Sequence, residues 1–235
     1  MSDEEPEQDD VAGDGPESAA ERLRYTAARE RMVAEQIESR GVQDAAVLRA
    51  MRAVPRELFV PRASRPYAYD DTPLPILANQ TISQPYVVAY MIETLRLGPA
   101  DRVLEVGAGS GYAAAVLSRI AREVYTVERH RRLADYARVR LARAGCDNVQ
   151  VLHGDGTLGW PEHAPYDGII VAAGGPAVPD SLRAQLAVGG RLVMPVGRSK
   201  HQQNLVLVTR QTAIDYNEES LAPVAFVPLI GDEGW

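Results

Sequence analysis

The stretch from Arg102 to Tyr112, RVLEVGAGSGY, constrains the fold of this chain more than any other part of the sequence. Its first half is an apolar run that suits a buried strand, and its second half contains Gly107, Gly109 and Gly111. Glycine tolerates positive φ and has no Cβ, so the backbone can turn tightly there and approach a ligand closely. The run from Tyr112 to Ile120 is a strong helix former. We therefore expect a strand, a glycine turn and a helix whose N-terminus faces a nucleotide-like ligand.

The charge of the chain is unevenly distributed. Nine of its 32 acidic and one of its 25 basic residues lie in residues 1–22, which leaves residues 23–235 with 23 acids, 24 bases and a net charge of +1. The acidic segment contains few large apolar residues, so we expect a disordered tail there. The near-neutral remainder has the length of one domain and offers no charge-based case for nucleic-acid or membrane binding.

The same chain carries a single cysteine, Cys146, which excludes an intramolecular disulfide and fits a reducing compartment. No apolar run approaches the roughly 18 residues of a membrane span. The start of the chain is acidic, unlike a signal peptide. We therefore expect a cytoplasmic protein, and a monomer by default, because no dimerisation surface is readable.

Hydrophobic periodicity predicts two helices near the N-terminus, over residues 25–40 and 45–53, with Asp44 as the cap of the second. Residues 62–84 have little periodicity and several prolines. A loop this long in a compact domain tends to be functional. A helix should follow from Pro85 to about Leu97.

Strands and helices alternate after the glycine turn. The sequence predicts strands over residues 123–128, 149–152, 166–172, 190–195, 203–209 and 222–230, with helices over 131–144 and 179–187. With the strand before the glycine turn, this alternation predicts a doubly wound α/β fold with a mostly parallel, seven-stranded sheet and an antiparallel C-terminal edge. The ligand should lie at the carboxyl ends of the strands.

Acidic residues near three successive strand ends indicate the type of ligand. Glu105 precedes the glycines, Glu128 ends the next strand and Asp155 follows the third. A carboxylate beside the turn repels a pyrophosphate but suits a cationic amino acid, Glu128 can bind both ribose hydroxyls, and Asp155 can bind an adenine amino group. This pattern favours S-adenosylmethionine. Tyr112, bulky where dinucleotide folds want a small residue, and Glu105 disfavour a dehydrogenase.

Each acid taken singly could equally be a solvated loop residue or a helix cap. Tyr112 and Trp160 could pack against adenosine, although a core or rim position suits Trp160 better. The histidines lack the spacing of metal ligands, so we expect no metal site; they are His130, His153, His163 and His201.

Longer motifs carry a resemblance to a known family. Residues 103–112, 166–171 and 189–195 resemble class I methyltransferases generally. Other segments resemble protein-L-isoaspartate O-methyltransferases over residues 30–230: Met32-Val33, 40–44 (RGVQD), 54–61 (VPRELFVP), 71–76 (DTPLPI), 80–85 (QTISQP), 154–160 (GDGTLGW) and 226–229 (FVPL). This chain has Asn79 where the family usually has glycine, a difference that bears on the conformation of the loop.

The resemblance implies methyl transfer from S-adenosylmethionine to the free α-carboxylate of L-isoaspartyl residues in damaged proteins, with S-adenosyl-L-homocysteine as product. It implies that residues 23–97 hold the N-terminal helices and substrate loop and that residues 98–235 form the cofactor-binding core. A carboxylate is already ionised at pH 7, so no general base is needed. The alternatives are a carboxyl methyltransferase acting on Asp in a dedicated peptide and a non-catalytic cofactor-binding protein.

By resemblance, Ser83 lies at the reacting carboxylate and is the catalytic candidate. Its residue type alone favours a cap for the helix opened by Pro85. Gln203 is a further candidate for substrate contact, or else a polar residue at a strand edge. The expected cofactor-binding residues are Thr81, Ile82, Glu105, Gly107, Ala108, Gly109, Ser110, Gly111, Tyr112, Glu128, Arg129, Asp155 and Gly156.

Overall fold

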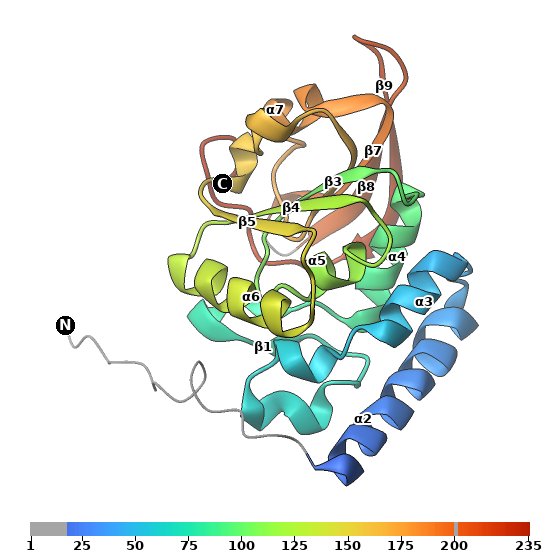
Figure 1. Cartoon of the computed structure of the whole chain (residues 1–235). Helices are drawn as coiled ribbons and strands as arrows, with labels where there is room; N and C mark the ends of the chain where they lie inside the picture. Colours follow the sequence, from blue (N-terminus) through green and yellow to red (C-terminus); the bar gives the residue numbers. More distant parts are fainter. Residues whose placement is uncertain (1–17, 200–201) are drawn as a thin grey trace, which may run out of the picture.

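A seven-stranded sheet forms the centre of the molecule in the computed structural model, which describes residues 18–199 and 202–235 (Figure 1). Its strands lie in the order β5-β4-β3-β6-β7-β8-β9, and β8 runs antiparallel to both of its neighbours whereas the other pairs are parallel. The strands are β3 (Arg102–Val106), β4 (Glu123–Glu128), β5 (Val149–His153), β6 (Tyr166–Val171), β7 (Leu186–Ser199), β8 (Gln202–Arg210) and β9 (Tyr216–Val224). The predicted mostly parallel sheet with an antiparallel edge is confirmed.

Successive apolar side chains of β3 point to opposite faces of the sheet and contribute to a hydrophobic core on each face. Val103 and Leu104 are both fully buried, and successive side chains of a strand point to opposite faces. Val103 joins the core under α4 (Pro85–Leu95), α5 (Tyr112–Leu117) and α6 (Arg131–Arg143). Leu104 joins the core under α7 (Asp180–Ala184), which covers the other face in Figure 1. Both faces are therefore covered, as a doubly wound fold requires.

The strand register brings the functional segments together. Val106, the last residue of β3, pairs with Val127 on one side and with Val171 on the other. The carboxyl ends of these three strands are therefore level, and the segments that follow them meet at one edge of the sheet.

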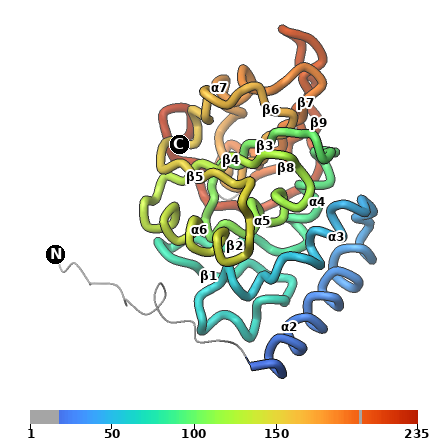
Figure 2. The backbone as a smooth tube through the Cα atoms, viewed as in Figure 1, coloured from blue at the N-terminus to red at the C-terminus, as the bar shows by residue number. Residues whose placement is uncertain are grey.

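The N-terminal helices form a layer beside α4, and Figure 2 shows them along one side of the sheet. Helix α2 (Ala19–Arg31) continues through a π-helical turn (Met32–Ile37) and a 3₁₀ turn (Glu38–Arg40), and it ends at Gly41 with φ +100°. Helix α3 (Ala45–Ala53) has the bounds that the sequence predicted, and the Asp44 carboxylate accepts a hydrogen bond from the Ala46 N–H at 2.7 Å.

The predicted boundary of the acidic tail is wrong at its C-terminal end. Helix α2 begins at Ala19, because Ser18 and Glu21 form a capping box in which each side chain binds the other residue's backbone N–H. The remainder of the predicted tail, residues 1–17, lies outside the described residues.

The last predicted strand is displaced. We expected it over residues 222–230, but β9 is Tyr216–Val224, and the chain then leaves the sheet to run past the strand ends, where Pro228 forms an isolated bridge with Gly174. Shorter differences affect α5, which ends at Leu117, and α7, which begins at Asp180 and ends at Ala184.

Two short strands organise the long loop before α4. Strand β1 (Leu74–Pro75) pairs with β2 (Thr81–Ile82), and between them lies a 3₁₀ turn (Leu77–Asn79) with Ala78 at φ 57° and Asn79 at φ 54°. Asparagine is one of the residues that enter the left-handed region most readily, so Asn79 can adopt a conformation that also suits the glycine usual in the family.

Gly111 and Gly145 provide a test of how the glycine turn packs on α6. Both have positive φ, but a Cβ on Gly111 would lie 3.2 Å from Leu141 and 3.3 Å from Ala137, whereas a Cβ on Gly145 meets nothing within 4 Å. We expect Gly145→Ala to lower the free energy of unfolding by about 1 kcal/mol and Gly111→Ala by roughly 2–4 kcal/mol, because only the latter adds overpacking to backbone strain. Denaturant titration of both variants measures this; equal losses would contradict it.

Candidate active site

The glycine turn and the end of β4 are joined by hydrogen bonds. The Gly107 N–H donates to the Val127 carbonyl at 2.8 Å, and the Gly109 N–H donates to one carboxylate oxygen of Glu128 at 2.9 Å. The other oxygen of Glu128 accepts the His130 N–H at 2.8 Å. Glu128 is buried, and two backbone donors fix the orientation of its carboxylate.

A cavity of about 260 Å³ lies over this turn. It is bounded by the turn, the end of β4, the loop around β2 and the segment from Val227 to Ile230. Of the predicted cofactor-binding residues, the cavity brings together Thr81, Ile82, Glu105, Gly107, Ala108, Gly109, Ser110, Tyr112, Glu128, Arg129 and Gly156, and Ser83 also lines it. Their contact with a cofactor stays a prediction, which this convergence supports.

Gly111 is absent from the lining of this cavity. It caps the N-terminus of α5 at φ 89°, and its Cα faces Leu141 and Ala137 of α6. The described contacts therefore give Gly111 a packing role, in which the missing side chain lets two helices approach closely.

Asp155 also lies outside the cavity lining, and its carboxylate is hydrogen-bonded within the protein. One oxygen accepts the N–H and the hydroxyl of Thr157, at 2.9 and 2.8 Å, and the other accepts the Asp232 N–H at 2.8 Å. Burial alone would raise the pKa of Asp155, but these hydrogen bonds outweigh it and hold the pKa below its ordinary value. In this structure Asp155 anchors the C-terminal segment, and its binding of adenine stays a prediction.

That C-terminal segment supplies site residues that the sequence reasoning missed. Four cavity-lining residues come from it, namely Val227, Pro228, Leu229 and Ile230. The indole N–H of Trp235 donates to the Gly174 carbonyl at 2.9 Å, and the Glu233 carboxylate accepts the Ser181 N–H at 3.0 Å. The motif at residues 226–229 was a visible signal, but its apolar residues favoured a strand.

Glu105 is the most perturbed acid of the cavity. Its side chain is 1% exposed, and its carboxylate accepts the hydroxyl of Thr126, its cross-strand neighbour, at 2.6 Å. Burial raises the pKa of Glu105 to about 8, the Thr126 hydrogen bond opposes this rise and the nearby charge of Glu128 adds to it. A cation bound in the cavity would favour the ionised form.

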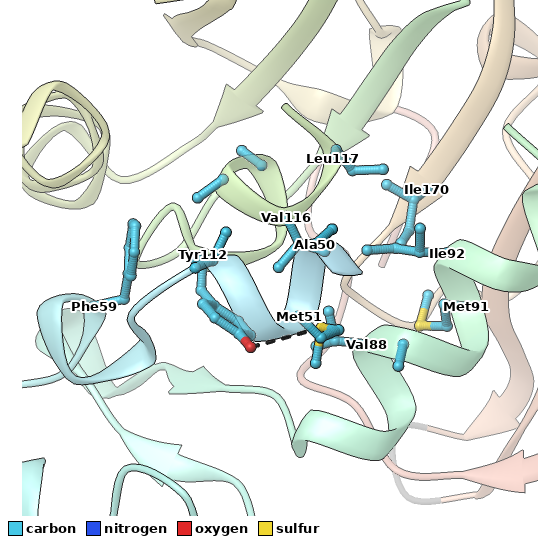
Figure 3. Close-up of a cluster of buried hydrophobic side chains, with 14 of the residues drawn as sticks. Ala50, Met51, Phe59, Val88, Met91, Ile92, Tyr112, Val116, Leu117 and Ile170 are labelled. Atoms are coloured by element: carbon cyan, nitrogen blue, oxygen red, sulfur yellow. Dashed lines mark hydrogen bonds between the residues drawn. The ribbon is translucent and has the colours of Figure 1, made fainter. Parts of the chain in front are cut away.

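The two candidate aromatic residues both belong to cores. Figure 3 shows the ring of Tyr112 directed into the N-terminal layer, where its hydroxyl lies 3.7 Å from the Met51 sulfur and its ring 5.8 Å from that of Phe59. Tyr112 therefore borders the cavity while its ring packs in the N-terminal layer. Trp160 packs edge-on against the Tyr125 ring, with the ring centres 5.5 Å apart, and it does not line the cavity. This position agrees with the predicted core or rim location of Trp160.

Ser83 lies on a wall shared by two cavities. The second cavity adjoins the first at Thr81, Ser83, Ala172 and Val227 and is otherwise lined by Pro73, Gln84, Val87 and residues 223–226. The cap position of α4 is Gln84, and no side chain caps that helix, so the alternative in which Ser83 is a helix cap is wrong. The Ser83 side chain thus does not cap α4, and Ser83 lines both cavities.

Gln203 is buried and does not line either cavity. Its amide makes two hydrogen bonds to the backbone of Phe226, accepting the N–H at 2.9 Å and donating to the carbonyl at 3.2 Å. Gln203 thus holds the segment that lines the second cavity, and its contact with substrate stays a prediction.

Within the described residues, no group of three or more His, Cys, Asp or Glu side chains is placed to hold a metal ion. No helix in the described ranges is long and apolar enough to cross a membrane.

The acidic residues of the first cavity fit a cationic nucleoside. Glu105 and Glu128 place two buried carboxylates beside a turn whose glycines leave room for a ligand, and apolar residues of the C-terminal segment face them. This fold and this cavity are those of a class I S-adenosylmethionine-dependent methyltransferase. The family model for protein-L-isoaspartate(D-aspartate) O-methyltransferase (PCMT) matches residues 27–234, and the chain belongs to that family.

Curated relatives and solved structures agree with this family. The protein-L-isoaspartate O-methyltransferase 1 of Rhodopseudomonas palustris (strain HaA2) is 63% identical over 90% of this chain and 86% of the relative. The protein-L-isoaspartate O-methyltransferase 2 of Pelobacter propionicus is 62% identical over 88% and 92% of the two chains.

Among solved structures, a protein-L-isoaspartate O-methyltransferase superposes with a TM-score of 0.78 at 31% identity, over 88% of this chain and 67% of that one. A PCMT structure from Plasmodium falciparum in complex with S-adenosyl-L-homocysteine gives a TM-score of 0.75 at 25% identity, over 86% and 98% of the two chains.

The raised pKa of Glu105 predicts how stability depends on pH. Its folded pKa of about 8 lies above the ordinary value of 4.5, so the folded state binds the extra proton between these values. The stability from this group is fully present below pH 4.5 and is lost as the pH rises through 8. Relative to Glu105→Gln, which mimics the protonated acid, the wild type should lose roughly 2 kcal/mol of unfolding free energy between pH 6 and 8.

Denaturant unfolding of the ligand-free proteins at the two pH values measures this loss. Glu162→Gln, at an exposed position, is the matched control and should follow the wild type. A Glu105→Gln variant with the same pH dependence as the wild type would contradict a raised pKa at Glu105.

Proposed function

We propose that this chain transfers the methyl group of S-adenosylmethionine to the free α-carboxylate of L-isoaspartyl residues in damaged proteins and peptides. The observation that carries the proposal is the position of Ser83 on the wall between the two cavities. The first cavity has the acids for the donor, and the second offers a place for a peptide. The comparisons support the isoaspartyl substrate, because the curated relatives bear that name at up to 63% identity.

The chemistry required of the protein is modest. When bound, S-adenosylmethionine supplies an electrophilic methyl group on a sulfonium. The substrate carboxylate is ionised at pH 7 and needs no base. Glu105 and Glu128 hold the donor by charge and hydrogen bonds, and the Ser83 hydroxyl donates to the substrate carboxylate and directs one of its oxygens toward the first cavity. Catalysis then comes chiefly from proximity and in-line orientation.

The product of this step is a methyl ester that activates the isoaspartyl linkage. The neighbouring backbone nitrogen attacks the ester carbonyl, methanol leaves and a succinimide forms. Water reopens this ring partly to normal aspartate, so the transfer starts repair.

The remaining assignments are also proposals. We place the chain in the cytoplasm, as a monomer without nucleic-acid or membrane partners, on the support of its single cysteine and the +1 net charge of residues 23–235. We also assign the N-terminal helices and the substrate loop to residues 23–97, from which Thr81 and Ile82 reach the first cavity, and the cofactor-binding core to residues 98–235. The second cavity and the C-terminal segment add Val224 and Phe226 to the substrate side.

A labelled methyl donor and a peptide pair test the function. We expect labelling of a peptide that contains L-isoaspartate and none of the same peptide with normal aspartate. Ser83→Ala should lower kcat/KM for the isoaspartyl peptide by about 10- to 100-fold, the value of a hydrogen bond to a charged group, while donor affinity measured by calorimetry changes little.

Ser118→Ala is the matched control, because Ser118 binds the Ala115 carbonyl at the end of α5 and lines neither cavity. Labelling of both peptides equally, or of neither, would refute the proposed function. A Ser83→Ala variant as active as Ser118→Ala would remove Ser83 from the mechanism.

A further inference from the structure

Arg56 connects the substrate loop to the cofactor turn. It begins a 3₁₀ turn (Arg56–Phe59) within the VPRELFVP motif, to which the proposed mechanism assigns no role, and its side chain is 0% exposed. Its Nε donates to the Ala68 carbonyl at 2.8 Å, and one terminal nitrogen, Nη2, donates to the Ser83 carbonyl at 2.9 Å. The guanidinium lies 4.8 Å from the centre of the Tyr112 ring.

Holding a loop with these contacts carries a cost in desolvation free energy. A buried guanidinium pays a large desolvation cost unless a charge pairs with it. None of the ion pairs formed among residues 18–199 and 202–235 includes Arg56, and its other terminal nitrogen, Nη1, is buried without a hydrogen-bond partner. An apolar residue would avoid this desolvation cost, but it would leave the Ala68 and Ser83 carbonyls without the guanidinium as a donor.

The positions of Ser83 and Tyr112 around the guanidinium suggest why a buried arginine is used here. Ser83 lies between β2 and α4 without a capping bond of its own, and Arg56 fixes its carbonyl. Tyr112, under the same guanidinium, is the first residue of the helix that follows the glycine turn. One rigid, planar group therefore contacts both the Ser83 backbone and the first residue after the glycine turn. In an active site a displacement of about 1 Å can cost 100-fold in rate.

We propose that Arg56 is a positioning residue for methyl transfer, which holds Ser83 in register with the glycine turn. The inference rests on the proposed function, because it acts through the Ser83 hydroxyl. It predicts that arginine is needed for its two directed hydrogen bonds, which the single ammonium of lysine cannot reproduce at both carbonyls.

Arg56→Lys tests the inference, with Arg140→Lys as matched control. Arg140 is 2% exposed and its guanidinium lies 4.7 Å from the Tyr136 ring, but it belongs to α6 and lines neither cavity. We expect Arg56→Lys to lower kcat/KM for an isoaspartyl peptide by about 10- to 100-fold, with calorimetric affinity for S-adenosyl-L-homocysteine within about threefold of wild type. Arg140→Lys should keep kcat/KM within about threefold.

A double-mutant cycle separates positioning from general destabilisation. In a Ser83→Ala background, Arg56→Lys should cost no more than about twofold in kcat/KM, because the hydroxyl that it positions is gone. Equal costs in the two backgrounds, or an Arg56→Lys variant that behaves like Arg140→Lys, would overturn the proposal.

A variant that does not fold can be distinguished from a wild-type protein that does not methylate isoaspartyl peptides. If Arg56→Lys does not fold, as judged by its melting transition, Arg56→Met replaces it in the same cycle. If neither variant folds, Arg56 serves stability and the proposal is overturned. A wild-type protein without isoaspartyl activity refutes the proposed function itself, whereas failure of the positioning role appears only in the variants.

Discussion

The hydrogen bond from the Gly109 N–H to the Glu128 carboxylate is the interaction on which the cofactor site depends. It spans two strand ends, and the pairing of Val106 with Val127 brings them level. Gly109 has φ +52°, so its N–H can point at the carboxylate in a turn that few other residues would form. Because the His130 N–H holds the second oxygen, the carboxylate cannot rotate away, and the cavity has one defined acidic wall.

The strand, turn and helix around Gly107–Gly111 could be predicted because the signals are local, and the parallel sheet then brought Glu105 and Glu128 to one cavity. What the sequence could not show depends on distant partners. Asp155 is occupied by the backbone of Asp232, which lies 77 positions away. The apolar residues from Val227 onward suit a strand equally well, and tertiary contacts with Gly174 draw them out of the sheet instead.

The parts that distinguish this family lie outside the sheet. The lack of periodicity in residues 62–84 was enough to mark the loop as functional, but its shape depends on the left-handed Ala78 and Asn79 and on packing against the N-terminal layer. No spacing rule links Arg56 to Ser83, 27 positions later, because a side chain to carbonyl contact leaves no pattern in a single sequence. We therefore propose that the core of the fold binds the donor and that the N-terminal layer with its loop positions the acceptor.

The buried Glu105 also determines how charge is balanced during binding. Burial raises its pKa to about 8, which favours the protonated form at neutral pH in the ligand-free protein. A cation that enters the cavity favours the carboxylate, so the proton departs as the positive ligand arrives. The positive charge of the ligand replaces that of the Glu105 proton, so the net charge inside the cavity changes little. A proton released in this way would pass to the solvent, and the heat of binding would then contain the ionisation enthalpy of the buffer.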